Sequence, residues 1–505
     1  MTRRKWLSTV LAGALLCACL PGGMKTAALD VSPQNRLTRA QAECIEPATG
    51  ANAARDNRER IQYCLDTYKV AKLGDGVFNV DGKIEVGDNC LLTAVNTTWP
   101  TIRAVSPVNY LLDVSGNNSS VSLLTIDYNH QYIMGGYPCR SVVGIEGSNN
   151  QISNCHIRGG AAPQRWYNAL TSALKTVTGV YFVNPECTGN TIYNCQIYNN
   201  TYGSIFVAGL TKNSTANNKL ENCRVYYNRS DGITIAGYGE VIGCVIHHNG
   251  FDCMNGTSST IPIPGANIYA LTNRNGALIR NNEIYDSNGN GVDIVECCDF
   301  VIEGNDIYDP GCRYFPDAED YQYCSYGSGV GMILCDVQQC VVEDNTISNH
   351  RATNKVGDAP YPDATTNKFF AASGAAAYSD LPDGPNQVIA FVLAESCGTD
   401  KHTTGNVIRN NRFRSAPDGN GATGLGYFTS RGTGFGVYGS TSDDEWSAST
   451  TNYFTLNTPF GSHIGSVRGG GNWFAANGED QNSDDDQHQP PYSDWTGSDN
   501  DMSHY

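Results

Sequence analysis

The chain has 505 residues, of which 54 are glycine and 19 are cysteine, and only 16% are charged. This length is long for one globular core, but a repeat architecture escapes that limit because each repeat packs only on its neighbours. The net charge of −17 argues against a nucleic-acid partner and against steering of polyanions by net charge.

The N-terminal residues are typical of an export leader. The basic stretch MTRRKW precedes the apolar stretch LSTVLAGALLCACL, which is too short for an ordinary membrane span. TRRKWLS resembles a twin-arginine signal, and an ordinary secretory signal cut near Ala28 is the alternative. We therefore expect a signal peptide over residues 1–28, and a protein that is secreted, periplasmic or at the cell surface. No later run is apolar enough to predict a membrane span.

An amphipathic helix is expected next. Residues 52–70 (NAARDNRERIQYCLDTYKV) place Ile61, Cys64, Leu65 and Tyr68 on one face of an amphipathic helix. Such a helix can plug the end of a solenoid, where apolar core and strand edges are otherwise exposed.

Eight later segments repeat one pattern: an apolar residue, three more residues, Cys or Asn, one residue, and another apolar residue. They are NQISNCHIRGG (150–160), NTIYNCQIYNN (190–200), NKLENCRVYYN (218–228), EVIGCVIHHNG (240–250), ALIRNNEIYDSN (277–288), FVIEGNDIYDPG (300–311), CVVEDNTISNH (340–350) and NVIRNNRFRSA (406–416). A short apolar strand precedes most of them, so that each unit has three strands. Self-similarity near 21–23 residues, without a helical period, predicts a parallel β-helix.

This repeat resembles the right-handed parallel β-helix of the pectate-lyase-like superfamily, over roughly residues 70–415. The resemblance implies an all-β fold, a single-stranded right-handed solenoid of three-strand coils with an N-terminal helical cap, over residues 40–415. Residues 416–477 would be a Gly-rich closing segment, and residues 478–505 an acidic, disordered tail. No single enzyme family within the superfamily is matched, since the histidine-rich motifs of pectate lyases and the GHG of polygalacturonases are missing.

One column of the repeat holds Cys or Asn in every unit: Cys155, Cys195, Cys223, Cys244, Asn282, Asn305, Asn345 and Asn411. Rungs stack ~4.8 Å apart, so asparagine amides can hydrogen-bond along the stack. The resemblance places this asparagine ladder at the turn between the second and third strands. The cysteines are either small buried filler or disulfides between stacked neighbours. Cys297 with Cys335, and Cys312 with Cys324, are further candidate pairs.

Long insertions all follow the third strand of a unit, at 159–178, 249–266, 309–328 and 349–387. Long loops on one corner of a rigid solenoid make a groove, and function concentrates in such loops. In the superfamily a polysaccharide cleft lies along the first strand, beside these loops.

The first strands are expected to present a small, apolar outer face, with Tyr181, Phe206 and Tyr269 as platforms for sugar rings. Asp293 is the only charge on that face from Tyr181 onward. A carboxylate among apolar neighbours has its pKa raised, as a general acid requires, and the alternative is a surface aspartate on a solvated strand.

Four further residues are candidate catalytic partners of Asp293. Asp231 opens a strand two rungs earlier, His248 ends a third strand, Asp252 follows in the loop, and Arg229 lies in a short loop. A second outward stripe includes His247 and Tyr285, which we expect either to bind glycan or only to stack.

The sequence therefore favours an exported enzyme that cleaves a polysaccharide by carboxylate acid/base catalysis. A uronan lyase or epimerase that uses Arg or His is one alternative, and a non-catalytic adhesive solenoid is another. We expect no cofactor, except Ca²⁺ if the protein is a uronan lyase, and a polysaccharide as the partner. Oligomeric state stays open.

Overall fold

The computed structural model describes residues 31–131, 140–160, 177–250, 265–287, 289–308, 331–335, 337–348, 388–396, 406–414, 423–430, 452–459 and 472–476. The chain divides into two compact units, Met1–Val245 and Ile246–Tyr505. The predicted leader, most of the predicted loops, Cys312, Cys324 and the acidic tail lie outside the described residues.

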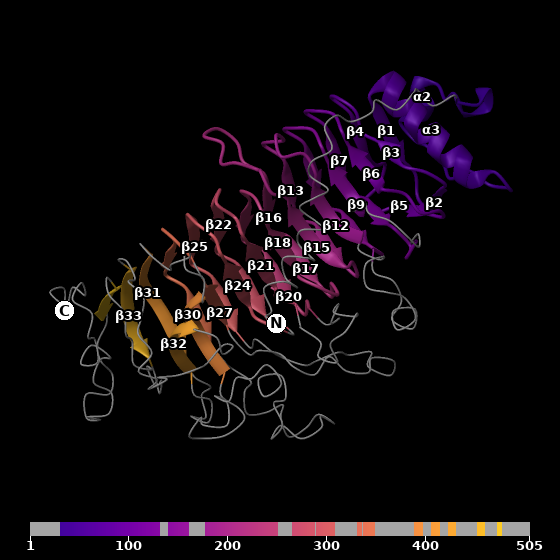
Figure 1. Ribbon diagram of the computed structural model, residues 1–505. Coiled ribbons are helices and arrows are strands. Elements are labelled where there is room, and N and C mark those ends of the chain that lie inside the picture. The colour runs from indigo at the N-terminus through magenta and orange to yellow at the C-terminus, as the bar shows by residue number, and fades with distance from the viewer. Residues whose placement is uncertain are drawn as a thin grey trace, which may run out of the picture. The chain divides into compact units, whose positions relative to one another are not determined.

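A helical cap opens the N-terminal unit, as Figure 1 shows. It consists of the 3₁₀ turn η2 (Pro33–Asn35) and the helices α2 (Arg39–Ala42) and α3 (Ala53–Tyr68). The amphipathic helix predicted over 52–70 is confirmed, because α3 buries Ile61, Cys64 and Leu65 and packs against β1 (Val70–Leu73) and β2 (Val77–Val80). It ends at Lys69, whose backbone is left-handed with φ 59°.

The rest of the N-terminal unit is built from rungs of three strands. The first strands are β3 (Ile84–Glu85), β6 (Tyr110–Val114), β9 (Arg140–Ile145), β12 (Val177–Phe182), β15 (Tyr202–Phe206) and β18 (Ile233–Ile235). The second strands are β1 (Val70–Leu73), β4 (Leu91–Ala94), β7 (Ser120–Ser122), β10 (Gln151–Ser153), β13 (Thr191–Tyr193), β16 (Lys219–Glu221) and β19 (Glu240–Ile242). The third strands are β2 (Val77–Val80), β5 (Thr101–Ala104), β8 (Thr125–Asp127), β11 (His156–Arg158), β14 (Gln196–Tyr198) and β17 (Arg224–Tyr226).

The C-terminal unit follows the same plan. Its first strands are β21 (Ile268–Leu271), β24 (Val292–Val295), β27 (Met332–Cys335), β30 (Val388–Ser396) and β32 (Thr423–Ser430). Its other strands are β20 (Val245–His247), β22 (Ala277–Arg280), β23 (Glu283–Tyr285), β25 (Phe300–Glu303), β26 (Asp306–Tyr308), β28 (Val341–Glu343), β29 (Thr346–Ser348), β31 (Val407–Arg414), β33 (Asn452–Pro459) and β34 (Asn472–Ala476). Parallel pairing continues past residue 415, because β32 pairs with β30 and β33 pairs with β31.

Each strand pairs in parallel with the equivalent strand of the next rung, so equivalent side chains stack. The second strands of the N-terminal unit bury one such column, which consists of Val121, Ile152, Ile192, Leu220 and Val241. Alternation along each short strand sends these β-branched and leucine side chains inward and their neighbours outward. The parallel β-helix predicted from the repeat is confirmed.

The predicted asparagine ladder is present in the C-terminal unit. The backbone N–H of Asn282 donates to Oδ1 of Asn305 at 3.0 Å, and the same bond joins Asn305 to Asn345 and Asn345 to Asn411. Asn305, Asn345 and Asn411 also donate from Nδ2 to a strand carbonyl one rung earlier, as Asn305 does to Ile279 at 3.0 Å. The amides thus satisfy polar groups that the tight turn buries.

Cysteine takes over this role in the N-terminal unit. The N–H of Cys155 donates to Sγ of Cys195 at 3.4 Å, and Sγ of Cys195 donates to the carbonyl of Ile152 at 3.6 Å. Cys223 bonds the carbonyl of Ile192 in the same way, at 3.3 Å. The thiol therefore mimics the asparagine amide, as one acceptor and one weak donor.

Two other corners of the N-terminal unit carry asparagine ladders that the sequence reading missed. Asn150, Asn190 and Asn218 stack before the second strands, where N–H of Asn150 donates to Oδ1 of Asn190 and N–H of Asn190 donates to Oδ1 of Asn218. Asn200 and Asn228 stack after the third strands in the same manner, at 3.1 Å.

The disulfide alternative is not supported by the described cysteines. Cys155, Cys195, Cys223, Cys244 and Cys297 are all buried and form no disulfide bond. The proposed pairing of Cys297 with Cys335 is wrong because of register. Val295 lies beside Cys335, so the same 40-residue offset sets Cys297 beside Val337.

Thiol labelling tests this arrangement. We expect N-ethylmaleimide to leave the four stacked cysteines of the N-terminal unit unmodified in the native protein and to modify them after unfolding in urea. They are buried, and burial raises the pKa of Cys195, which lowers the reactive thiolate fraction. Exposed Cys44 is the internal control. Mass-spectrometric detection of Cys155–Cys195 or Cys223–Cys244 cross-links in non-reduced protein would contradict the thiol ladder.

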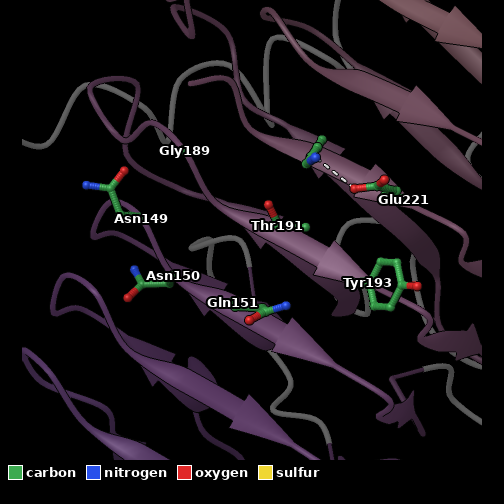
Figure 2. Close-up of a pocket in the computed structure, with 8 residues that line it drawn as sticks. Asn149, Asn150, Gln151, Gly189, Thr191, Tyr193 and Glu221 are labelled. Carbon is green, nitrogen blue, oxygen red and sulfur yellow. Dashed lines mark ion pairs between the residues drawn. The ribbon is translucent and has the colours of Figure 1, made fainter. Parts of the chain in front are cut away.

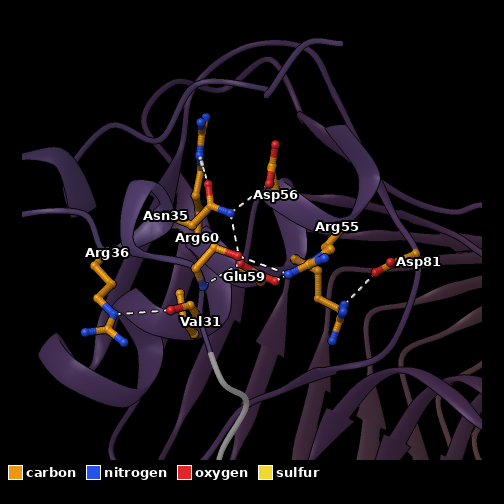
Figure 3. Close-up of polar contacts among 10 residues, drawn as sticks. Val31, Asn35, Arg36, Arg55, Asp56, Glu59, Arg60 and Asp81 are labelled. Carbon is orange, nitrogen blue, oxygen red and sulfur yellow. Dashed lines mark hydrogen bonds and ion pairs between the residues drawn. The ribbon is translucent and has the colours of Figure 1, made fainter. Parts of the chain in front are cut away.

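A buried carboxylate fastens the cap, as Figure 3 shows. Glu59 is 2% exposed and accepts hydrogen bonds from the Ser32 N–H, from Nδ2 of Asn35 and from Nε of Arg55, at 2.7–2.9 Å. Burial by itself would raise the pKa of Glu59, but the bonds from Arg55, Asn35 and Ser32 outweigh burial and lower the pKa to about 2.

Replacement of Glu59 by Gln should therefore destabilise the protein in a pH-dependent way. A carboxyl with a lowered folded-state pKa adds stability above its unfolded pKa and loses it as pH falls through the folded value. We expect a loss of about 1–3 kcal/mol at pH 7, which shrinks between pH 4.5 and about 2. Thermal unfolding across pH checks this, with the exposed Glu186→Gln as control. An unchanged difference at pH 2 would contradict it.

Candidate functional site

The first-strand sheet of the N-terminal unit has an outward row whose members are paired in register from rung to rung. The row consists of Glu85, Asp113, Gly144, Tyr181, Ile205 and Thr234. Glu146 lies two residues after Gly144 and Lys83 two residues before Glu85, so both share this face. The row therefore concentrates charge at its N-terminal end and becomes apolar toward β15.

Lys83, Glu85, Asp113 and Glu146 form what we call the carboxylate cluster. Nζ of Lys83 lies 2.6 Å from Oδ2 of Asp113 and 3.5 Å from Oε2 of Glu85. Asp113 is only 3% exposed, and its other oxygen, Oδ1, has no hydrogen-bond partner among the described residues. Oγ of Ser115 donates to Oε1 of Glu85 at 3.2 Å. A buried carboxylate oxygen without a partner is costly, and such groups gather at functional sites.

The cluster changes the proton affinity of its members. Burial raises the pKa of Glu146, and the negative charge of Asp113 adds to that rise. Burial also raises the pKa of Asp113, while the hydrogen bond and charge of Lys83 oppose the rise. Burial lowers the pKa of Lys83, but Asp113 and Glu85 outweigh it, and the net shift is upward. Lys83 therefore stays an ammonium ion beside Asp113. Glu146 has no ion pair with a cation among the residues that the structure describes.

Register also sets the spacing of the two acids. Asp113 pairs with Gly144 on the next rung, and Glu146 is two residues further along. A rung spacing of ~4.8 Å and a rise of ~3.3 Å per residue put the Cα atoms of Asp113 and Glu146 roughly 8 Å apart. The two side chains face the same side of the sheet.

The sequence reading missed this cluster because it considered the outward face only from Tyr181 onward. A signal was present in three strand ends, IEVG (84–87), LDVSG (112–116) and IEGS (145–148). In each of them an acidic residue directly follows a buried apolar residue. The long insertions, by contrast, all lie C-terminal to this cluster.

Asp293 lies in the C-terminal unit and faces outward, as predicted. Its neighbours along β24, Val292 and Ile294, are fully buried, whereas Asp293 is half-buried. It is paired in register with Tyr269 and accepts a hydrogen bond from Nδ2 of Asn290 at 2.8 Å. Its catalytic role stays a prediction.

His247 and His248 meet each other and a carboxylate in the same unit. Their Nδ1 atoms are 2.8 Å apart, and Nε2 of His248 lies 3.7 Å from Oδ2 of Asp286. The ring of His247 stacks on Tyr285, with centroids 4.8 Å apart. His248 is held by a left-handed backbone, φ 52°, and this aims its ring at Asp286 and not along the strand.

Arg229 and Asp231 belong to the N-terminal unit, in the turn before β18, and both are buried. Oγ1 of Thr234 lies 3.4 Å from Oδ2 of Asp231, and the N–H of Arg229 donates to the carbonyl of Asn200 at 2.9 Å. Asp252 lies outside the described residues. The structure thus brings His248 and Asp286 together, and it places Arg229 and Asp231 in one turn.

The outward position predicted for Phe206 is wrong. Its register partner in β12 is Phe182, and the two buried rings stack with centroids 4.5 Å apart. Ile205 is the outward residue beside Tyr181. Tyr181 and Tyr269 do face outward, but they are only 2% and 8% exposed. The sequence reading aligned β12 and β15 one residue out of step, which moves a side chain to the opposite face.

Replacement of Phe206 by Ala should therefore cost stability and not glycan affinity. Removing a buried phenylalanine leaves a cavity and typically costs about 3–5 kcal/mol. Urea unfolding measures this loss, and Tyr193→Ala, which truncates an exposed aromatic ring, is the matched control and should change stability little. If the Phe206→Ala protein is as stable as the parent, the buried position of Phe206 is wrong.

A ridge of stacked rings follows the third strands of each unit. In the N-terminal unit Tyr198 and Tyr226 stack at 5.0 Å, and the guanidinium of Arg158 lies 6.0 Å from the Tyr198 ring. In the C-terminal unit Tyr285 and Tyr308 stack at 5.0 Å. Because their faces are used against one another, these rings support the stacking alternative more than the glycan-binding one.

Within the described ranges, no three His, Cys, Asp or Glu side chains are placed to hold a metal ion. The same ranges contain no helix that is long and apolar enough to cross a membrane.

Comparison with known proteins supports the β-helix architecture. The family model described as right handed beta helix region matches residues 125–268. The chain has a right-handed parallel β-helix fold. A search of curated proteins finds no match.

Solved structures resemble this β-helix at low sequence identity. The Dettilon tailspike protein (gp208) is 16% identical, with a TM-score of 0.51 over 86% of this chain and 67% of the tailspike. Pectate lyase Pel9A is 14% identical, with a TM-score of 0.37 over 60% of this chain and 75% of the lyase. The A-module of mannuronan C-5 epimerase AlgE6 from Azotobacter vinelandii is 12% identical, with a TM-score of 0.36 over 74% and 94%. These likenesses concern the fold.

Proposed function

We propose that the protein is an exported carbohydrate-active β-helix protein that cleaves a polysaccharide along its first-strand sheet by carboxylate acid/base catalysis. The observation that supports this most is the carboxylate cluster, in which Asp113 and Glu146 face outward together with raised pKa values. Two carboxyls that flank the bond to be broken are what glycoside hydrolysis requires.

Glu146 is the proposed general acid. It keeps its proton to a higher pH than an ordinary glutamate and gives that proton to the oxygen of the glycosidic bond as the bond breaks. Asp113 is the proposed base. Its buried oxygen Oδ1 makes no hydrogen bond within the described residues and is the atom proposed to take a proton from a water molecule that enters with the substrate, while Lys83 holds Oδ2 at 2.6 Å and stabilises the ionised form.

The spacing favours inversion at the anomeric carbon. Inverting glycosidases separate their carboxyls by ~6.5–9.5 Å so that a water molecule fits between base and sugar, and retaining enzymes need only ~5–5.5 Å. The Cα atoms of Asp113 and Glu146 lie roughly 8 Å apart with both side chains on one face, and we propose that the two carboxyls keep the longer separation. The water attacks the sugar, its proton passes to Asp113, and the leaving sugar takes the proton of Glu146.

Asp293 and its neighbours support a second candidate centre, in the C-terminal unit. The contact of His248 with Asp286 suits a base that removes a sugar-ring proton, as a uronan lyase or epimerase needs. Lys83 does not suit that role, because its raised pKa keeps it protonated. A non-catalytic glycan-binding solenoid is the remaining alternative.

A polysaccharide screen with matched variants separates these candidates. We expect the parent to release reducing ends from at least one glycan without absorbance at the unsaturated-uronate band. Glu146→Gln and Asp113→Asn should each lower that rate by about 10²–10⁴-fold, and the exposed Glu186→Gln should not. Loss of activity in Asp293→Asn alone, with Glu146→Gln unaffected, would move the centre to the C-terminal unit. Absence of cleavage by the parent would favour the binding protein.

A further inference from the structure

A second surface of the N-terminal unit has the features of a ligand site, away from the first-strand sheet. It is a hollow of about 420 Å³ on the outer face of the second strands β10, β13 and β16, shown in Figure 2. Its walls are side chains of neighbouring rungs, which the β-helix holds in register. Its volume is within the range of small-ligand pockets, ~300–1,000 Å³.

The lining side chains offer unused hydrogen-bonding groups. Gln151, Thr191 and Lys219 are paired in register across the three strands, and Asn149 precedes β10. The side chains of Asn149, Gln151 and Thr191 make no hydrogen bond within the part of the chain that the structure describes. This differs from adjacent Asn150, whose amide is used in a corner ladder.

An aromatic ring stands at the edge of these polar groups. Tyr193 lies between Ser153 and Glu221 in register, and it is 38% exposed. It differs from Tyr198 and Tyr226, which cover each other, because no aromatic contact is made by Tyr193 within the described chain. An uncovered ring beside amides and a hydroxyl suits a sugar, whose C–H face stacks on the ring while its hydroxyls meet the polar groups.

The charges of the hollow cancel. Nζ of Lys219 lies 2.7 Å from Oε2 of Glu221, as the dashed line in Figure 2 marks, and the two side chains are equally half-buried. The pair leaves no net charge to attract a uronate or a phosphate. It does present a donor and an acceptor on opposite sides, which suits neighbouring hydroxyls of a neutral sugar.

A glycine keeps the hollow open. Gly189 has φ +70°, and a Cβ at this position would lie 2.3 Å from Oδ1 of Asn149. Any larger residue would therefore push the Asn149 amide out of place. Gly189, in the turn before β13, therefore leaves room for the Asn149 side chain in the wall of the hollow.

From these observations we propose that this hollow is a secondary binding site for a neutral glycan, with Tyr193 as its stacking platform and Asn149, Gln151 and Thr191 as its hydrogen-bonding wall. The proposal rests on the proposed function for the class of ligand. The site has no acid with an unpaired carboxylate, so it binds without cleaving. It would hold a long chain to the solenoid while another segment of that chain occupies the first-strand sheet.

Affinity electrophoresis of the full-length protein tests the site. The probes are the neutral polymers dextran, xylan and galactomannan, and the anionic polymers polygalacturonate and alginate. We expect at least one neutral polymer to retard the parent, and Tyr193→Ala to weaken that retardation about tenfold, since loss of one stacking ring is of that order. Tyr193→Phe keeps the ring and should retain most of the affinity, while the off-site Val105→Ala should match the parent.

The outcomes separate this proposal from the first one. Circular dichroism first shows whether each variant is folded. If Tyr193→Ala is folded and is retarded like the parent, or if only the anionic polymers are retarded, the secondary site is wrong even where cleavage is intact. If Glu146→Gln abolishes cleavage but keeps retardation that depends on Tyr193, both proposals stand. If no polymer retards the parent, the secondary site is overturned regardless of cleavage.

Discussion

The fold depends on a single constraint, which is that every tight corner of the solenoid buries backbone groups that must find partners one rung away. Asn305, Asn345 and Asn411 meet it with an acceptor for one N–H and a donor for one carbonyl. Because rungs are held ~4.8 Å apart by the parallel strands, identical side chains at each corner repeat the same bonds.

Cysteine can stand in for asparagine at this corner because the bonding demand there is small. Sγ of Cys195 accepts from Cys155 and donates to Ile152, which are the two tasks of the amide. A thiol makes weaker hydrogen bonds than an amide but packs as an apolar atom, so the cost is offset by burial. The column thus changes residue type without changing geometry, and its cysteines have no need to become cross-linked.

A scaffold fixed in this way can place outward side chains where an irregular loop could not. Lys83, Asp113 and Glu146 come from successive rungs and share one face, where burial raises the pKa of both acids. On the second strands, in contrast, the charges of Lys219 and Glu221 neutralise each other beside Tyr193. One rigid frame therefore carries a charged, proton-active row and a neutral, polar hollow.

The sequence by itself determined the repeat, the three strands of each coil, the capping helix over 52–70 and one ladder, because all of these follow from local periodicity. It also placed Asp293 on an outer face, since alternation along a single strand is enough for that. Only the tertiary structure decided the register between rungs, which turned Phe206 inward, set Cys297 beside Val337 and gathered Glu85, Asp113 and Glu146. These contacts join residues 24 to 40 positions apart. A shift of one residue cannot be seen in a periodic sequence, but it reverses the face that each side chain occupies.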